Sequence, residues 1–260
     1  MSDVLQDKVV VVAGVGPGLG RSIALQCAKA GADVVLAART ESRLGEVADE
    51  IKQLGRRTLQ VGTDINSEES AQNLVDATLA EFGRLDALVN NAFAIPPLGA
   101  LQTVDFEQVR AGFETNVLGG LRLTRLFVPA LAESGGNVVM INSSVLRHSS
   151  MPYGAYKMAK SALLALAQAL ATELGPQGIR VNSVAPGYIW ADTLQNYFAY
   201  LAKKRGVEAQ VVYDETAANM DLRRLPDPDA IADAVVFLAS TMARDITGHC
   251  LDVNCGEFHH

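Results

Sequence analysis

A glycine-rich turn near the start of the chain constrains the fold more than any other feature of the sequence. It follows Lys8–Ala13, a run of β-branched apolar residues that is typical of a strand buried on both faces of a parallel sheet. After the turn, Arg21–Ala30 predicts a helix and Asp33–Ala38 predicts a second strand. These segments together predict a βαβ unit, and therefore an α/β fold with a parallel sheet. The glycines of the turn are Gly14, Gly16, Gly18 and Gly20.

This strand–turn–helix context predicts a dinucleotide-binding site rather than an ordinary turn. Glycine lets the backbone come close to a pyrophosphate, which binds to the free N–H groups at the N-terminus of the following helix. The second strand ends at Ala38 and Arg39, where an acidic residue would bind the ribose hydroxyls of NAD. Because a guanidinium binds phosphate with two parallel hydrogen bonds, Arg39 favours NADP. NAD is the alternative, with Arg39 then a solvated loop residue.

The composition limits the classes of protein to which the chain can belong. With 260 residues, 49% of them hydrophobic and 20% charged, the chain is long enough for one globular domain over residues 1–260. Its net charge of −7 argues against a nucleic-acid surface, and it has no apolar run of the roughly 18 residues that span a bilayer. The cysteines and histidines lack the spacing of a metal site or a disulfide framework. The N-terminus has no signal-peptide pattern, so we expect a cytoplasmic protein.

Candidate catalytic side chains follow the predicted strand Asn137–Ile141. Tyr156 and Lys160 are four residues apart, so a helix would place them on one face, one turn apart. A cation at that distance favours the phenolate and lowers the tyrosine pKa from about 10, so Tyr156 could exchange a proton with an alcohol oxygen. The hydroxyl of Ser143 could hold the same oxygen from the other side.

Several motifs of the sequence, taken in order, resemble those of the short-chain dehydrogenase/reductase family. They are the G-x-x-x-G-x-G spacing of Gly14, Gly18 and Gly20, then Asn90-Asn91-Ala92, Thr115-Asn116-Val117, the set of Ser143, Tyr156 and Lys160, and Pro186-Gly187. The resemblance covers about Leu5 to Gly256, nearly the whole chain. It implies a doubly wound (Rossmann) sheet of about seven parallel strands in a three-layer αβα fold.

The resemblance also implies a set of cofactor-binding residues, of which Asp64 would contact the adenine and Lys160 the nicotinamide ribose. The full set is Gly14, Gly16, Gly18, Leu19, Gly20, Arg39, Asp64, Ile65, Asn91, Ala92, Tyr156, Lys160, Pro186, Gly187 and Ile189. The chain departs from the family pattern at Ala13 and Ala191, where the family usually has Thr, and at Phe93, where it has Gly. At position 191 the missing hydroxyl would otherwise hold the nicotinamide carboxamide.

Two choices among similar residues depend on the family spacing and on the helix downstream. Ser143 is preferred to Ser144 because family members place the serine two residues after the last apolar strand residue. Tyr153 and Lys157 have the same spacing as the preferred pair, but Tyr156 leads directly into the apolar helix that follows. Each of these patterns is weak evidence when it stands alone. A Tyr and a Lys at this spacing are common in helices, and paired serines after a strand commonly cap a helix.

Asn116 falls inside a long helix predicted over residues 105–133, where its amide would compete for backbone hydrogen bonds. By resemblance, an asparagine at this point bends the helix locally and holds a water that links the catalytic lysine to solvent. The alternative is a buried amide with its hydrogen bonds satisfied.

The residues between about 190 and 225 predict a helical lid over the site. The aromatic residues of this segment are Trp190, Tyr197, Phe198, Tyr200 and Tyr213. Together with Leu146, Met151 and Tyr153 they suggest an apolar substrate pocket, although they could be ordinary core aromatics. The helix predicted over Ala155–Leu174 has few charges, and by resemblance it forms a subunit interface with the Asn116 helix. We therefore expect a homo-oligomer, either a tetramer or a dimer.

The expected function is hydride transfer between NADP(H) and a carbonyl or secondary alcohol of a lipophilic small molecule. Tyr156 would be the acid–base residue, Lys160 would lower its pKa, Ser143 would polarise the oxygen, and Asn116 would support a proton relay. Three alternatives stay open: an NAD-dependent alcohol dehydrogenase of the same family, an epimerase or dehydratase on the same fold, and a non-catalytic NADP-sensing protein.

Overall fold

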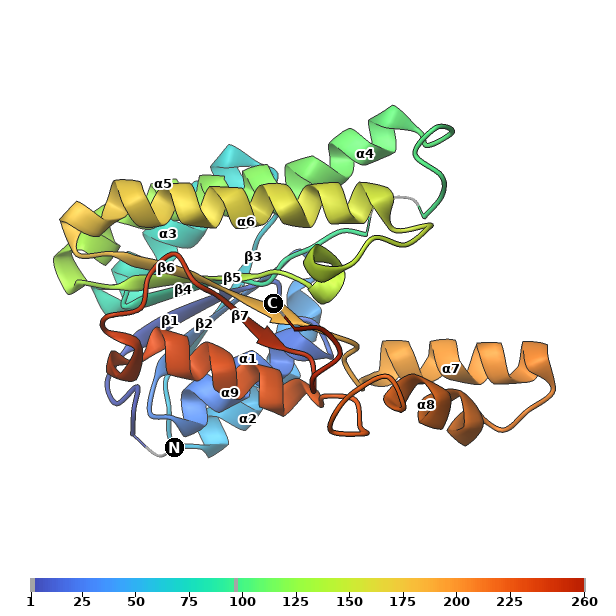
Figure 1. The fold of residues 1–260 in the computed structure, drawn as a ribbon. Coiled ribbons are helices and arrows are strands. Elements are labelled where there is room, and N and C mark those ends of the chain that lie inside the picture. The colour runs from blue at the N-terminus through green and yellow to red at the C-terminus, as the bar shows by residue number, and fades with distance from the viewer. Residues whose placement is uncertain (1–2, 96–97, 260) are drawn as a thin grey trace.

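The computed structural model describes residues 3–95 and 98–259, so the last residue of the predicted domain lies outside it, as do residues 1–2 and 96–97. It contains a seven-stranded parallel sheet with the order β3-β2-β1-β4-β5-β6-β7, enclosed between two layers of helices (Figure 1). The predicted doubly wound three-layer fold is therefore confirmed. The strands are β1 (Val9–Ala13), β2 (Asp33–Ala38), β3 (Thr58–Gly62), β4 (Ala87–Asn90), β5 (Asn137–Ile141), β6 (Arg180–Pro186) and β7 (Cys250–Val253).

The two faces of the sheet carry separate hydrophobic cores. Helices α1 (Leu19–Lys29), α2 (Leu44–Gln53) and α9 (Pro228–Ala239) cover one face, and α3 (Glu68–Phe82), α5 (Gly119–Ser134) and α6 (Gly154–Leu174) cover the other (Figure 1). Alternate residues of β1 divide between them, because successive side chains of a strand point to opposite faces. Val10 and Val12 belong to the core under α1, and Val9 and Val11 belong to the core under α5. This explains why the strand has no polar residue.

The register of the central strands brings the predicted cofactor residues to one edge of the sheet. Ala13 at the end of β1 pairs with Ala37 of β2 on one side and with Asn90 of β4 on the other. The turns that follow β1, β2 and β4 therefore meet at the carboxyl edge of the sheet. In doubly wound sheets ligands bind at this edge, where the strand order reverses.

The helix predicted over residues 105–133 contains a wide turn in the middle. It consists of α4 (Phe106–Phe113), a π-helical turn at Glu114–Leu118, and α5. The side-chain amide of Asn116 donates to the carbonyl oxygen of Gly112 at 2.7 Å. In a regular α-helix that oxygen would accept from the backbone N–H four residues later, so the amide competes for it and the turn widens.

The segment predicted as a lid is helical, with α7 (Asp192–Arg205) and α8 (Ala209–Ala217) extending away from the main body beyond the carboxyl edge of the sheet (Figure 1). Its aromatic residues, however, largely pack on one another. The Trp190 ring lies 5.6 Å from that of Phe198 and 4.7 Å from that of Tyr213, measured between centroids. These three side chains form the small core of the segment with other apolar residues. The alternative of core aromatics therefore applies to them.

Across the described ranges, no helix combines the length and the apolar character that crossing a membrane requires.

Candidate active site

The glycine-rich turn forms a tight cradle between β1 and α1. Gly14 has a φ of +101°, and a Cβ on it would lie only 2.4 Å from the backbone nitrogen of Ala92. A Cβ on Gly20 would lie 2.3 Å from the carbonyl oxygen of Gly14. The Asn91 side chain donates to that same oxygen at 2.6 Å, so it ties the end of β4 to the turn. Gly14 and Gly20 are thus required by packing within the chain itself.

Gly16 and Gly18 face open space instead. Around a Cβ placed on Gly16 there is nothing within 4 Å among the described residues, and Gly18 would meet only the Ala191 side chain, at 3.8 Å. Gly18 immediately precedes α1, whose first residue is Leu19, and the N–H groups of a first helical turn have no acceptor within the helix. An exposed backbone with free donors is what a pyrophosphate needs, so the cradle fits the predicted dinucleotide.

A cavity of about 240 Å³ extends from the cradle across the carboxyl edge of the sheet. Arg39 lines it, is exposed, and has no hydrogen bond or ion pair among the residues that the structure describes. Asp64 is exposed at its rim and accepts a hydrogen bond from the backbone of Asn66. Ile65 is buried in its wall. The predicted cofactor residues at the ends of β1, β2, β3 and β4 therefore surround one space.

The predicted catalytic residues lie together at the ends of β5 and α6. The Ser143 side chain is close enough to the Tyr156 hydroxyl to affect its titration, and both residues line one cavity. Lys160 is buried, its ammonium nitrogen lies 5.8 Å from the centre of the Tyr156 ring, and it donates to the carbonyl oxygen of Ile141 at 2.9 Å. The lysine therefore joins the N-terminal part of α6 to the end of β5, next to the serine.

Burial sets the titration of this pair. It raises the pKa of Tyr156 to about 12, while the nearby Ser143 side chain acts in the opposite direction. Burial also lowers the pKa of Lys160 to about 7, because a buried ammonium loses its hydration. We expected the neighbouring cation to lower the pKa of Tyr156, but burial raises it instead. The phenol is protonated at neutral pH in this site.

Asn116 faces the same region from the π-helical turn. Its amide nitrogen donates to Gly112 and, at 2.6 Å, to the carbonyl oxygen of Ala94. Its amide oxygen is buried and has no hydrogen-bond partner among the described residues. Within the protein the amide oxygen is thus left as an acceptor for water, and the alternative of a fully satisfied amide stays open.

The competing Tyr153–Lys157 pair has another arrangement. The ammonium of Lys157 donates to the carbonyl oxygens of Val145, Leu146 and His148, at 3.3, 3.0 and 2.6 Å. Lys157 therefore holds the loop after β5 rather than a tyrosine. The other serine, Ser144, is buried at the start of that loop and lines the same cavity as Ser143.

A second cavity, of about 200 Å³, adjoins the catalytic residues. It is lined by Ser143, Ser144, Val145, His148, Ser150, Tyr153, Tyr156, Gly187, Tyr188, Glu257 and Phe258. Of the predicted residues after β6, Gly187 faces this cavity, Pro186 is buried as the last residue of the strand, and Ile189 packs against the core under α1. Glu257 was not predicted, and no local pattern marks it except the preceding asparagine and glycine of a turn.

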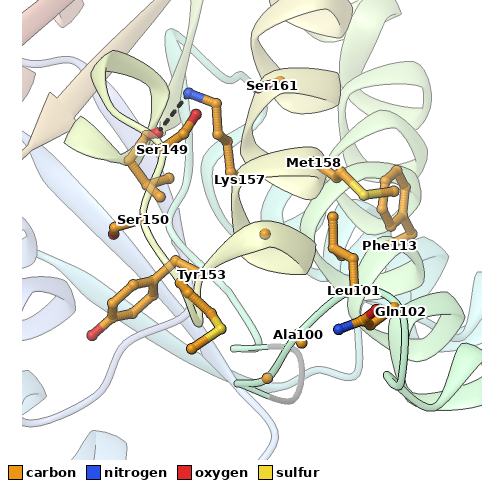
Figure 2. Close-up of a pocket in the computed structure, with 14 residues that line it drawn as sticks. Ala100, Leu101, Gln102, Phe113, Ser149, Ser150, Tyr153, Lys157, Met158 and Ser161 are labelled. Carbon is orange, nitrogen blue, oxygen red and sulfur yellow. Dashed lines mark hydrogen bonds between the residues drawn. The ribbon is translucent and has the colours of Figure 1, made fainter.

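A third and larger cavity of about 900 Å³ lies beyond Tyr153, on the side of α4 and α6. Figure 2 shows Leu101, Phe113 and Met158 on one side of it and Tyr153 on the other, with the tyrosine hydroxyl directed away from them. Val145, Ser150 and Tyr153 line both this cavity and the one at the catalytic residues. The predicted apolar pocket residue Met151 lines the larger cavity, whereas Leu146 lines neither of the two.

Known proteins are similar to this chain in both sequence and fold. A family model described as "Enoyl-(Acyl carrier protein) reductase" matches residues 14–257. L-rhamnose 1-dehydrogenase (NAD(P)(+)) of Azotobacter vinelandii is 36% identical over 263 residues, which cover 98% of this chain and 98% of that protein. The 7alpha-hydroxysteroid dehydrogenase of Escherichia coli is 32% identical over 97% of this chain and 94% of its own length.

The chain belongs to the short-chain dehydrogenase/reductase family. It is a pyridine-nucleotide oxidoreductase that acts on alcohol or carbonyl groups. Among solved structures, L-sorbose reductase from Gluconobacter frateurii, complexed with NADPH and L-sorbose, matches with a TM-score of 0.94 and 29% identity. The match covers 100% of both chains, so the family resemblance of the motifs extends to the whole fold.

Proposed function

We propose that this short-chain dehydrogenase/reductase transfers a hydride between NADP(H) and a carbonyl or secondary alcohol, with Tyr156 as the acid–base residue. One observation carries the proposal: Tyr156 and Ser143 line one cavity beside the buried Lys160, at the edge of the sheet that also holds the glycine cradle. A protonated phenol and a second hydroxyl converge there, as needed to hold and protonate a carbonyl oxygen.

The residues support reduction at neutral pH. When bound, the nicotinamide supplies the hydride chemistry. The Tyr156 hydroxyl, with a pKa of about 12, carries the proton that a reduced carbonyl oxygen must receive. Ser143 holds that oxygen with its own hydroxyl. Oxidation of an alcohol needs the phenolate instead, so its rate should rise with pH over the range below the tyrosine pKa.

Lys160 and Asn116 fit the role of a proton relay. An ammonium with a pKa of about 7 can release and recover a proton near neutral pH. The unpartnered amide oxygen of Asn116 is a buried acceptor, and a water that donates to it would satisfy it. We propose this route for returning a proton to Tyr156 after each turnover.

For the cofactor we propose NADP over NAD. Arg39 is exposed on the wall of the nucleotide cavity and has no ion-pair partner within the described residues, so its guanidinium is available for a 2′-phosphate. The relative complexed with NADPH and L-sorbose has the same fold over its whole length. The name of the A. vinelandii relative includes both cofactors, which keeps NAD as the second candidate.

For the substrate, the predicted lipophilic character is supported by the apolar residues of the 900 Å³ cavity beyond Tyr153. An apolar portion of a substrate bound at Tyr156 would extend into it past the shared wall. The names of the relatives include both a steroid and sugars, so apolar and polar substrates are found on this fold.

We also propose a homo-oligomer built on the outer face of α6, where Ser161, Ala165 and Ala169 are exposed one turn apart. Exposed small residues allow two helices to approach closely. Phe106 at the start of α4 and Met158 on α6 are exposed apolar side chains as well. The predicted cytoplasmic location remains a prediction.

Replacing Tyr156 with phenylalanine tests the proposed reaction. The variant keeps the ring in place but has no proton to give, so kcat for NADPH-dependent carbonyl reduction should fall at least a hundredfold. NADPH affinity, measured by fluorescence titration, should change less than threefold. A Tyr200→Phe variant, at an exposed position of α7, serves as the control and should retain most of the kcat. Full turnover by the Tyr156→Phe enzyme would contradict the assignment.

A further inference from the structure

The carboxylate of Glu257 is an ionisable group at the catalytic cavity whose chemistry the proposed reaction does not use. It lines the same cavity as Ser143 and Tyr156. Its Oε2 atom is buried and has no hydrogen-bond partner among the described residues. Burial alone raises the pKa of this carboxyl, with no neighbouring cation opposing it. A buried acceptor without a donor is costly, and water or a substrate group that enters the cavity would supply one.

Glu257 lies in a tight turn after β7. After β7, Cys255 and Gly256 both have positive φ values, of 55° and 80°. The side chain of Asn254 accepts from the backbone N–H of Gly256 at 2.9 Å and donates to the carbonyl oxygen of Phe258 at 3.2 Å. A Cβ on Gly256 would lie 2.7 Å from Asp221. The backbone around Glu257 is therefore fixed by its own hydrogen bonds and by close packing.

The turn directs the carboxylate toward the residues after β6. A Cβ on Gly187 would lie 3.1 Å from Oε2 of Glu257, so the oxygen lies against that glycine. The neighbouring Phe258 ring stacks on His148 with centroids 4.8 Å apart, which joins the segment to the loop after β5. Glu257 thus faces the reacting groups across the cavity, between the two loops that enclose it.

Two tyrosines, Tyr153 and Tyr188, line the cavity together with Glu257. The phenol of Tyr188 is near enough to Glu257 and to Tyr153 for both to affect its titration. Neither tyrosine hydroxyl has a side-chain hydrogen bond recorded within the described ranges, and both residues line the cavity. Phenols can donate and accept, and the carboxylate only accepts, so this wall matches hydroxyl groups, which also do both.

We propose that Glu257 accepts a hydrogen bond from a hydroxyl group of the substrate, so that the enzyme selects hydroxylated carbonyl compounds and polyols over simple ketones and alcohols. This inference rests on the proposed function and names the substrate class for that site. Tyr188 and Tyr153 contribute further hydrogen bonds to the same substrate. An apolar portion elsewhere in the substrate stays compatible with the larger cavity beyond Tyr153.

The selectivity follows from the cost of leaving Glu257 without a partner. A simple ketone of the same length would fill the cavity and displace water, but it would offer the carboxylate no donor. A hydroxy ketone restores the hydrogen bond. Sites that bond a substrate hydroxyl discriminate more strongly against its absence than apolar pockets discriminate against an extra group.

Reduction of matched four-carbon ketones tests the proposal. We would measure kcat/KM for 2-butanone, 1-hydroxy-2-butanone and erythrulose, with NADPH and with NADH. The wild type should prefer erythrulose to 2-butanone at least tenfold. Glu257→Leu should reduce that preference at least tenfold, mainly by raising KM for erythrulose, and Glu257→Gln should keep part of it because the amide oxygen still accepts. The matched control is Glu133→Leu, at an exposed carboxylate near the end of α5, which should change nothing.

A binding measurement separates this inference from the proposed reaction. Erythrulose can be titrated into the complex of enzyme and NADP⁺, which cannot reduce it, and its affinity followed by calorimetry. Glu257→Leu should weaken binding at least fivefold. If binding depends on Glu257 but no ketone is reduced, the proposed reaction fails and the inference stands. If ketones are reduced and the Glu257 variants keep the wild-type preference and affinity, the inference is wrong and the reaction stands.

Discussion

At the scale of single residues, Lys160 combines a charge with complete burial. Its ammonium has one recorded hydrogen bond, to the carbonyl oxygen of Ile141, and its pKa is lowered to about 7. In the unfolded chain the same group would have a pKa of about 10.4. Folding therefore disfavours the charged form of Lys160. The residue lowers the stability of the fold, while the chemistry of the site needs it.

Replacing Lys160 with methionine should stabilise the fold and abolish activity. Below pH 7 the lysine is charged in both states, so its burial penalty is fully present there. Between pH 7 and about 10.4 the unfolded state binds more protons than the folded state, so wild-type stability rises with pH and the penalty disappears. The gain in Tm of Lys160→Met over the wild type should therefore be larger at pH 6 than at pH 10. A gain that is equal at both values would contradict the burial argument.

Arg39 allows a separate test of cofactor choice. Arg39→Asp replaces a cation with the type of residue that binds ribose hydroxyls, and it should weaken NADPH binding at least tenfold. NADH binding should stay the same or improve. Fluorescence titration with both cofactors measures the change, and Arg57→Asp, at the exposed residue just before β3 at the amino edge of the sheet, serves as the charge-matched control. If the wild type binds NADH more tightly than NADPH, Arg39 has no role in the choice of cofactor.

The residues of the site differ in how far sequence could predict them. Tyr156, Lys160 and Ser143 lie within one contiguous segment, so strand and helix geometry alone brings them together. Glu257 approaches Gly187 only because the chain reverses after β7, and that turn depends on Asn254. The pKa of Tyr156 could not be predicted from a neighbouring cation, since burial is a property of the whole fold.

At the scale of elements, Asp86 joins the amino ends of the central strands. Its carboxylate accepts from the backbone N–H of Val9 at 3.0 Å, from Lys8 at 3.1 Å and from Arg84 at 2.9 and 2.6 Å. Its own carbonyl oxygen accepts from the backbone of Asn137 at 2.9 Å. Desolvation tends to raise the pKa of this carboxyl, but these hydrogen bonds and charges outweigh it, so the pKa lies below its ordinary value.

Asp86→Ala should therefore destabilise the fold by about 2 kcal/mol, because it removes the buried acceptor of the Val9 backbone N–H and the shared partner of two half-exposed cations. Since the folded pKa is lowered, the wild-type contribution is present above the unfolded pKa of about 3.9 and is lost as the pH falls below it. Urea denaturation at pH 7 and at pH 3 measures both effects, and the difference between variant and wild type should shrink at pH 3. The cluster lies at the edge of the sheet opposite to the site, so kcat should be unchanged. Glu133→Ala is the control.

The strands and helix ends were the most predictable elements, for local reasons. The apolar run of β1 and the glycine at the end of α3, Gly83 with a φ of 70°, are signals that tertiary contacts do not override. The π-helical turn at Asn116 differs, because it depends on the Ala94 carbonyl oxygen from a distant loop. The division of the substrate region by Tyr153 into two cavities also has no counterpart in local sequence.

At the scale of the whole molecule, the exposed face of α6 is the feature that a monomer does not explain. Ala165→Arg places a charge and a long side chain in the middle of this face. It should shift the protein from oligomer to monomer in sedimentation velocity, while the circular dichroism of the fold is retained. Asn73→Arg, on the exposed side of α3, should leave the sedimentation coefficient unchanged. A wild type that sediments as a monomer would contradict the proposed interface.

The order of the strands also bears on how the protein is made. β1, β2 and β3 lie within the first 62 residues, and with β4 they supply the glycine cradle and the nucleotide cavity. Ser143 and Tyr156 come later, and Glu257 comes near the very end of the chain, followed within the site only by Phe258 among the described residues. Since synthesis proceeds from the N-terminus, a nascent chain carries the nucleotide-binding residues before it can distinguish one substrate from another.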